Sequence, residues 1–193
     1  MSLANNIYYL YIIKFSKWFM LYMPIIGLFY ADHGLHPADL FILQSGYSFA
    51  SAIFEIPSGY LADVVGRKKT LVLGSTLGAL GFSVYVFFSG FWFFLCAEVI
   101  MGIGQSFISG SDSAMLYDTL RESGRKNMYV KHEGVMSSFG GFAETIAAVI
   151  GGFIAVLISL NSVFVFQVFI AACAIPAALL LVEPQRKKRV QEK

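Results

Sequence analysis

The sequence predicts an all-α polytopic membrane protein with six transmembrane helices. Hydrophobic residues make up 57% of the 193 residues and charged residues only 13%, whereas soluble domains carry about a quarter charged residues. The mean hydropathy is +0.68, and a chain of this length cannot bury so much apolar surface in a core of its own. We therefore expect lipid to surround it, and six apolar runs reach or approach the ~20 residues that a helix needs to cross a bilayer.

The predicted helices follow one another with short connections. In chain order they cover residues 7–30, 37–62, 70–88, 91–120, 135–160 and 163–182. The second begins with Pro37, at a position where the missing N–H has no helical partner to lose. Little more than Ser89-Gly90 links the third to the fourth, so these two form an antiparallel hairpin. Residues 1–182 are thus expected to form a transmembrane domain, and residues 183–193 a basic tail.

The distribution of lysine and arginine predicts the orientation. Twelve of the fourteen lie in the connection after the second helix, in the connection after the fourth, and in the tail: Arg67, Lys68, Lys69, Arg121, Arg125, Lys126, Lys131, Arg186, Lys187, Lys188, Arg189 and Lys193. Because cytoplasmic loops are enriched in these residues, both termini are expected in the cytoplasm, with the chain in a cell (inner or plasma) membrane. The tail either contacts anionic membrane lipid or only sets the topology.

A short basic turn between the second and third predicted helices is the most informative segment. Its pattern is carried by Gly59, Leu61, Asp63, Gly66, Arg67 and Lys68. Gly66 permits a tight reversal, and the planar Arg67 guanidinium can bind a carboxylate through two parallel hydrogen bonds. The expected partner is Asp118, at the end of the fourth predicted helix. The alternative is that the basic residues only determine topology.

This turn resembles the motif G-x-L-A-D-x-x-G-R-K between helices two and three of the major facilitator superfamily, at every defined position. The run 113–118, which ends in Asp118, is similar to the end of helix four in that family. The resemblance implies a secondary active transporter working by alternating access, with helices one and four lining the path. It also implies that Arg67 and Asp118 form a cytoplasmic latch that holds the outward-open state.

Charged residues inside the predicted spans are costly in hydrocarbon and usually face a cavity or a partner. Lys14, Lys17, Asp112 and Glu144 fall at similar depths, which predicts one cluster of two bases and two acids. Glu98 stands apart in the outer half, where many proton-coupled members of the resembled family carry arginine. It either carries a proton or makes a structural hydrogen bond to a neighbouring helix. The candidate residues for substrate or coupling-ion binding are Lys14, Lys17, Glu98, Gln105, Asp112 and Glu144.

Small residues indicate where helices approach closely: Gly102, Gly104, Gly151 and Gly152 are the predicted packing positions. Cys96 and Cys173 lie in apolar runs and are interpreted as packing residues. Nothing resembles a nucleotide-binding loop, a metal cluster or a nucleophile with its base, so the sequence predicts neither an enzyme nor a cofactor. A net charge of +2 is too small to suggest nucleic acid as a partner.

The family that the chain resembles has two six-helix halves, with substrate held between them. The chain is therefore expected to be one half of the major facilitator fold, acting on a small molecule with protons as the coupling ion. It would assemble as a parallel homodimer or with a different six-helix half. Two alternatives stay open: the truncated half of a longer transporter, inactive alone, and a membrane interaction subunit that does not transport.

Overall fold

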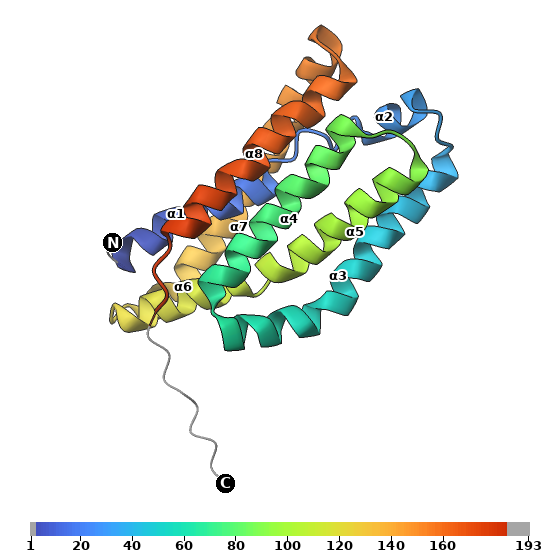
Figure 1. Cartoon of the computed structure of the whole chain (residues 1–193). Helices are drawn as coiled ribbons and strands as arrows, with labels where there is room; N and C mark the ends of the chain where they lie inside the picture. The colour runs from blue at the N-terminus through green and yellow to red at the C-terminus, as the bar shows by residue number, and fades with distance from the viewer. Residues whose placement is uncertain (1–2, 185–193) are drawn as a thin grey trace.

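The computed structural model describes residues 3–184, and every regular element in that range is helical (Figure 1). The helices are α1 (Asn6–Trp18), α2 (Ile26–Asp32), α3 (Pro37–Val65), α4 (Arg67–Phe87), α5 (Phe91–Ile108), α6 (Ser111–Glu122), α7 (Tyr129–Leu157) and α8 (Leu160–Leu180). Short 3-10 turns precede α1 (Leu3–Asn5) and α7 (Lys126–Met128). Most of the basic tail, from residue 185 on, lies outside the described residues.

Four described segments are long and apolar enough to cross a membrane: Arg67–Phe87, Phe91–Glu122, Lys126–Leu157 and Leu160–Leu180. The first predicted span does not qualify because it consists of two short helices. Helix α3 is 29 residues long but is not among these four segments, and it is visibly bent, with Pro57 inside it (Figure 1). The all-helical prediction is confirmed, whereas six crossings are not established.

The prediction of one continuous helix over 7–30 is wrong, because residues 19–25 form a turn between α1 and α2. Pro24 lacks an N–H and disfavours helical backbone in the residue before it. The Gln167 side chain of α8 satisfies the interrupted backbone: it accepts from Leu21 N at 2.8 Å and donates to the Phe19 carbonyl at 3.3 Å. Irregular backbone at membrane depth is tolerated only where protein covers it in this way.

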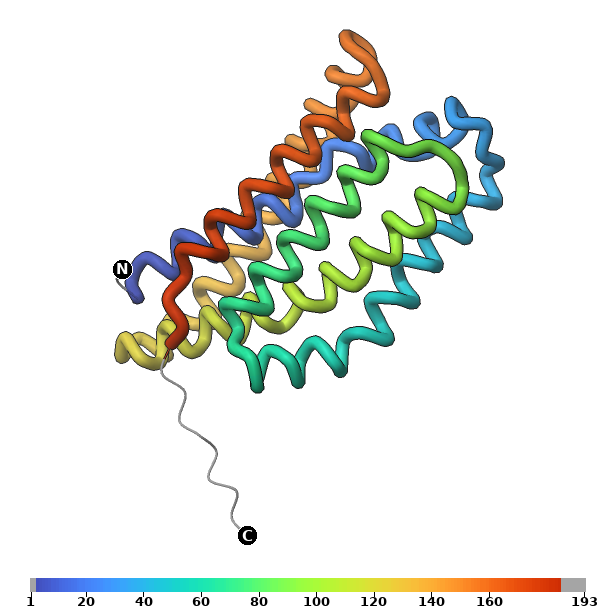
Figure 2. Tube along the Cα trace, in the orientation of Figure 1, coloured from blue at the N-terminus to red at the C-terminus, as the bar shows by residue number. Residues whose placement is uncertain are grey.

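The predicted span 91–120 is also interrupted, at Ser109-Gly110, and Figure 2 follows the Cα trace through the break between α5 and α6. Gly110 has φ +78°, a left-handed conformation that glycine adopts without steric penalty. Helix α6 therefore starts afresh at Ser111 and contacts α1, α4 and α7. The acids of α6 lie against other helices: Asp112 contacts Lys14 of α1, and Asp118 contacts Arg67 of α4.

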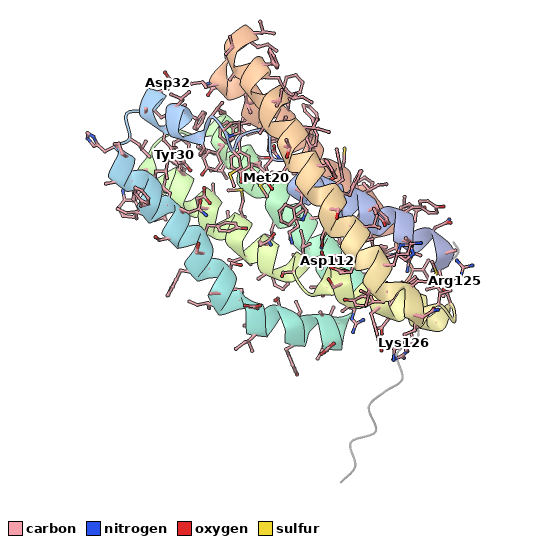
Figure 3. All side chains as sticks on the ribbon, turned by 180° about the vertical axis from the view of Figure 1, so that it is seen from behind. Met20, Tyr30, Asp32, Asp112, Arg125 and Lys126 are labelled. Atoms are coloured by element: carbon pink, nitrogen blue, oxygen red, sulfur yellow. The ribbon has the colours of Figure 1, made fainter. Side chains whose placement is uncertain are left out.

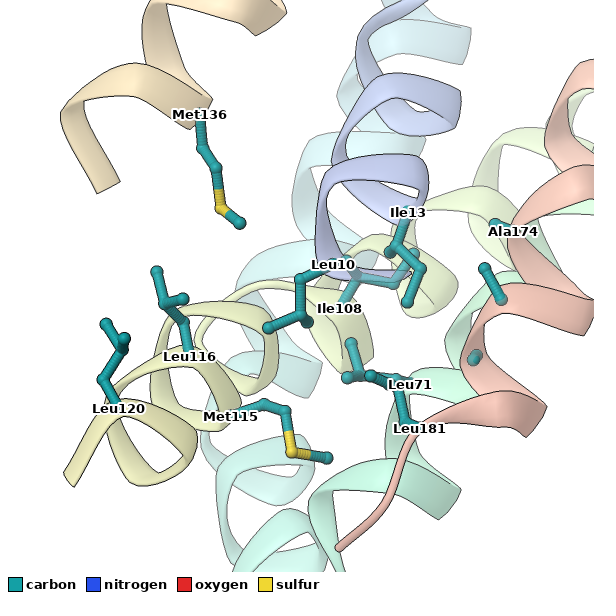
Figure 4. Close-up of a cluster of buried hydrophobic side chains, with 12 residues drawn as sticks. Leu10, Ile13, Leu71, Ile108, Met115, Leu116, Leu120, Met136, Ala174 and Leu181 are labelled. Atoms are coloured by element: carbon teal, nitrogen blue, oxygen red, sulfur yellow. The ribbon is translucent and has the colours of Figure 1, made fainter. Parts of the chain in front are cut away.

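The helices bury two apolar clusters, one toward each end of the molecule. The first surrounds Leu10, Leu71, Met115 and Leu116, where α1, α4 and α6 meet the end of α8 (Figure 4). The second is mainly aromatic and includes Phe29, Tyr85, Phe94 and Phe164. Cys96 and Cys173 are both exposed free thiols, so their interpretation as packing residues is wrong.

The four predicted packing glycines occupy different surroundings. A Cβ on Gly102 would lie 3.1 Å from Ala50 Cβ of α3, and one on Gly104 would lie 3.0 Å from the Gly74 carbonyl oxygen of α4. Helices α3 and α4 both run along α5, so these two glycines allow the close approach of three helices. Gly152, in contrast, has no neighbouring atom within 4 Å of its Cβ position.

Gly151→Ala is expected to lower the melting temperature of the protein in detergent. A Cβ on Gly151 would collide with the backbone carbonyl of Leu21, whose carbon lies 2.8 Å away, and this backbone cannot move without losing its bond to Gln167. Overpacking of this kind costs about 1–3 kcal/mol. Gly152→Ala is the matched control and should be neutral or slightly stabilising. Equal melting temperatures for the two variants would contradict this account of the turn.

Candidate functional site

One arginine connects the beginning of α4 to α6. Arg67 is the first residue of α4, and its guanidinium donates to both the Asp118 carboxylate and the Ala114 carbonyl of α6. The Arg67 and Asp118 side chains are 17% and 11% exposed, so the ion pair is largely screened from solvent. The structure thus brings together the two residues that the sequence pairs.

A second acid, Glu183, completes this junction and was missed by the sequence analysis. The backbone N–H groups of Arg67 and Lys68 donate to the two Glu183 carboxylate oxygens at 2.9 and 2.8 Å. A carboxylate at a helix N-terminus satisfies N–H groups that have no helical partner and complements the helix dipole. Gly66, with φ +116°, has only 3.3 Å between its Cβ position and Glu183 Oε2. A glutamate just after the last apolar run, at the same end as the turn, is the signal that could have indicated it.

The fully buried Asn6 links the same end of the molecule to the start of the chain. Its Nδ2 donates to Thr119 Oγ1 at 3.1 Å and to the Val182 carbonyl at 2.8 Å, while Val182 N donates to its Oδ1 at 2.9 Å. The starts of α1 and α4, helix α6 and the end of α8 therefore meet in one polar junction. Gly59, Leu61 and Asp63 lie in the last turns of α3, beside this junction.

The predicted charge cluster exists in part and with a different second acid. Lys14 Nζ donates to Asp112 Oδ2 at 3.2 Å and lies 3.6 Å from Glu133 Oε1, which also accepts from Ser113 Oγ at 2.9 Å. Among residues 3–184, no ion pair joins Glu144 to either lysine, and Lys17 has none within 4 Å. Helix α7 begins at Tyr129 rather than at 135, so its early turns bring Glu133 to the depth of Lys14.

Glu98 is buried and bound by two tyrosines from other helices. Tyr85 Oη of α4 donates to Glu98 Oε1 at 2.7 Å and Tyr30 Oη of α2 at 3.1 Å, and the two hydroxyls are 2.6 Å apart. Tyr85 stacks between Phe94 and Phe164, with ring centroids 4.9 and 5.0 Å apart. In Figure 3, Tyr30 lies at the end of the molecule opposite Arg125 and Lys126, with Asp112 between them. Glu98 and the Lys14 cluster are thus separate sites.

The remaining candidates, Lys17 and Gln105, line a partly open cavity of about 80 Å³. It lies between α1 with the following turn, α4, α5 and α8, with Tyr47 of α3 also in its wall. The structure therefore distributes the candidate residues over three places: the Lys14 cluster, the Glu98 and tyrosine group, and this cavity. Glu144 belongs to none of the three.

The sequence of the chain matches a known protein family. A family model described as the Major Facilitator Superfamily matches residues 10–193 of the chain. The chain belongs to this superfamily. Because superfamily members span membranes and four described segments are apolar enough to do so, the chain is a multi-pass membrane protein.

Three relatives illustrate how far the likeness extends. The chain is 27% identical to the inner membrane transport protein YajR of Escherichia coli over 161 residues, which cover 83% of the chain and 34% of YajR. It is 38% identical to a low affinity ammonium transporter of Saccharomyces cerevisiae over 103 residues, 51% of the chain and 19% of that protein. It is 28% identical to the methyl viologen resistance protein SmvA of Salmonella typhimurium, over 75% of the chain and 29% of SmvA. The chain thus spans about a third or less of the length of these relatives.

Proposed function

We propose that the chain forms one half of a secondary active transporter that moves a small molecule across a cell membrane by alternating access. The observation that carries this proposal is the junction of Arg67 with Asp118 and Glu183, formed at the turn that matches the superfamily motif. Ion pairs and hydrogen bonds at the end of a bundle can be exchanged for water when helices separate, so such a junction suits a latch that opens in each cycle.

Protons are the proposed coupling ion, and two sites support the proposal. The Glu98 carboxyl is held by the hydroxyls of Tyr30 and Tyr85, and hydroxyls can bond either the protonated or the ionised acid. Lys14 shares two acids, Asp112 and Glu133, so one acid can change protonation while the other keeps the lysine paired. The names of the relatives mention both ammonium and methyl viologen, and we therefore propose a small-molecule substrate without naming it.

The proposal also includes an orientation of the chain in the membrane and a partner for this half. Helix α4 begins, and the turn before α7 lies, at the end of the bundle where the described chain also begins and ends (Figure 1). These two segments carry the basic residues Arg67, Lys68, Lys69, Arg125 and Lys126. By the positive-inside rule this end is cytoplasmic. Helices α3 and α7 expose large apolar side chains, including Phe49, Ile56, Phe142 and Phe153, which would face lipid, a second copy of the chain, or a different six-helix half. Light scattering in mild detergent distinguishes a homodimer from a monomer.

Glu98→Gln is expected to abolish proton-driven uptake while leaving exchange intact. The amide keeps a hydrogen-bond acceptor for Tyr30 and Tyr85 but cannot carry a proton. Proteoliposomes with the purified chain and an internal pH dye measure proton flux when methylammonium or methyl viologen is added, and counterflow of the same probes measures exchange. Glu55→Gln, at an exposed position of α3, is the control. Proton flux that survives in Glu98→Gln would exclude Glu98 from coupling. Absence of all flux in the wild type would favour an incomplete half or a non-transporting subunit.

A further inference from the structure

The cavity beside Lys17 is lined by polar groups that have no partner among residues 3–184. Ser75 is 3% exposed, lines the cavity, and its Oγ has no hydrogen-bond partner in the described part of the chain. Two neighbours on the same helix show the usual arrangement, because Thr76 donates to the Val72 carbonyl and Ser83 to the Ala79 carbonyl, both at 2.8 Å. A buried hydroxyl without a partner is destabilising, so a bound molecule is a physical reason for its presence.

Two longer polar side chains meet Ser75 around the same space. Lys14 is paired with Asp112 and Glu133, whereas Lys17, one turn further along α1, lines the cavity and has no acid within 4 Å in the described part of the chain. Gln105 also lines it, and its side chain makes no hydrogen bond among residues 3–184. An ammonium, a hydroxyl and an amide from three different helices are thus available to one ligand.

The chemistry of these groups selects the ligand. An ammonium group only donates hydrogen bonds and an ionised carboxylate only accepts them, and bonds between such charged groups are the strong ones. The two acids that act on Lys17, Asp112 and Glu133, already share Lys14. A carboxylate supplied from outside therefore meets an ammonium that has no ion-pair partner among residues 3–184. Apart from Ser16, Tyr22 and Tyr47, the rest of the wall is glycine or apolar, including Gly78, Phe82 and Met101, which suits a short hydrocarbon chain.

We infer that this cavity binds a small carboxylate through Lys17, Ser75 and Gln105. Its volume of about 80 Å³ exceeds what one water molecule needs and limits the ligand to a few heavy atoms. The site lies apart from both the Glu98 group and the Arg67 junction. The inference deepens the proposed function by giving one class of ligand, and it concerns binding, which is measured without any transport.

The test is ligand-observed saturation-transfer NMR on the full chain in detergent, at constant ionic strength. Three probes of similar shape differ in charge: propionate, propionamide and propylammonium. Propionate is expected to bind saturably, propionamide about tenfold more weakly because it loses the charge-assisted bond, and propylammonium not at all. Equal affinities for propionate and propionamide, or binding of propylammonium, would overturn the assignment.

Variants of the chain test each group. Lys17→Met should weaken propionate binding about tenfold, with Lys131→Met, at an exposed position of α7, as control. Ser75→Ala should weaken binding yet raise the melting temperature of the ligand-free protein, because an unpaired buried hydroxyl is removed. Ser83→Ala loses a hydrogen bond that the wild type forms, so it should neither weaken propionate binding nor raise the melting temperature. A purely structural Ser75 would move the melting temperature without changing propionate affinity, and that outcome would exclude it from the site.

A third variant tests the place of binding without removing a polar group. A Cβ on Gly78 meets no atom within 4 Å, so Gly78→Ala should fold normally and reduce the cavity. It should therefore weaken propionate binding more than acetate binding. Unchanged affinities for both would place the carboxylate elsewhere. Carboxylate binding with no flux in proteoliposomes would support this site while contradicting transport, so the two proposals fail separately.

Discussion

Arg67→Ala is expected to reduce transport by about tenfold or more while leaving membrane insertion intact. The substitution removes the ion pair with Asp118 and the bond to the Ala114 carbonyl, which together fasten α4 to α6. Hydrogen bonds that involve a charged group contribute about 1.5–3 kcal/mol each, enough to shift a conformational equilibrium tenfold or more. Because the junction consists of polar contacts at one end of the bundle, the apolar clusters and the fold remain. Initial uptake rates in proteoliposomes, normalised to inserted protein, provide the measurement.

The exchanged pair Arg67→Asp with Asp118→Arg makes this test specific. It restores the attraction between α4 and α6 but cannot reproduce the bond from Arg67 to the Ala114 carbonyl, so partial recovery of uptake is expected. Lys69→Ala, an exposed lysine in the same turn of α4, is the control for charge alone and should transport normally. Wild-type rates in Arg67→Ala would rule out the latch. No recovery in the exchanged pair would mean that the backbone contact, rather than the charge pair, is essential.

Asp112→Asn is expected to destabilise the protein strongly. The Lys14 and Asp112 side chains are 12% and 8% exposed, and removal of one partner from a buried ion pair costs about 3–5 kcal/mol because the other charge is left without its closest partner. Glu133, at 3.6 Å, compensates for only part of this loss. The melting temperature in detergent should fall by several degrees. A double variant, Lys14→Met with Asp112→Leu, removes both charges and should recover most of the stability.

Glu144→Gln provides the decisive comparison, since the sequence pattern places Glu144 in the cluster and the structure places Glu133 there. Glu144→Gln should have a melting temperature near that of the wild type. The melting temperature of Glu133→Gln should lie between those of Glu144→Gln and Asp112→Asn. If Glu144→Gln proved as unstable as Asp112→Asn, the assignment of the second acid to Glu133 would be wrong.

Much of the fold is readable from local sequence. The low content of charged residues indicates lipid as the surroundings, and apolar runs with Pro37 and Ser89-Gly90 at their ends locate most of the helices. The pairing of Arg67 with Asp118 was also predictable, because the motif turn and the acid at the end of the fourth span share one end of the bundle. Lys14 and Asp112 could be matched by depth alone, since the rise per residue of a helix is constant.

The tertiary structure alone decided which residues complete these sites. Residues 19–25 leave the helix because Gln167, about 146 positions away in the chain, supplies the bonds that the broken backbone needs. Glu133 replaces Glu144 because α7 begins earlier than its apolar run. The tyrosines on Glu98 and the cavity beside Lys17 depend on how α1, α2, α4, α5 and α8 are rotated against one another. Local sequence shows which polar groups are costly to bury, but their partners come from other helices, and only packing sets the rotation and the ends of those helices.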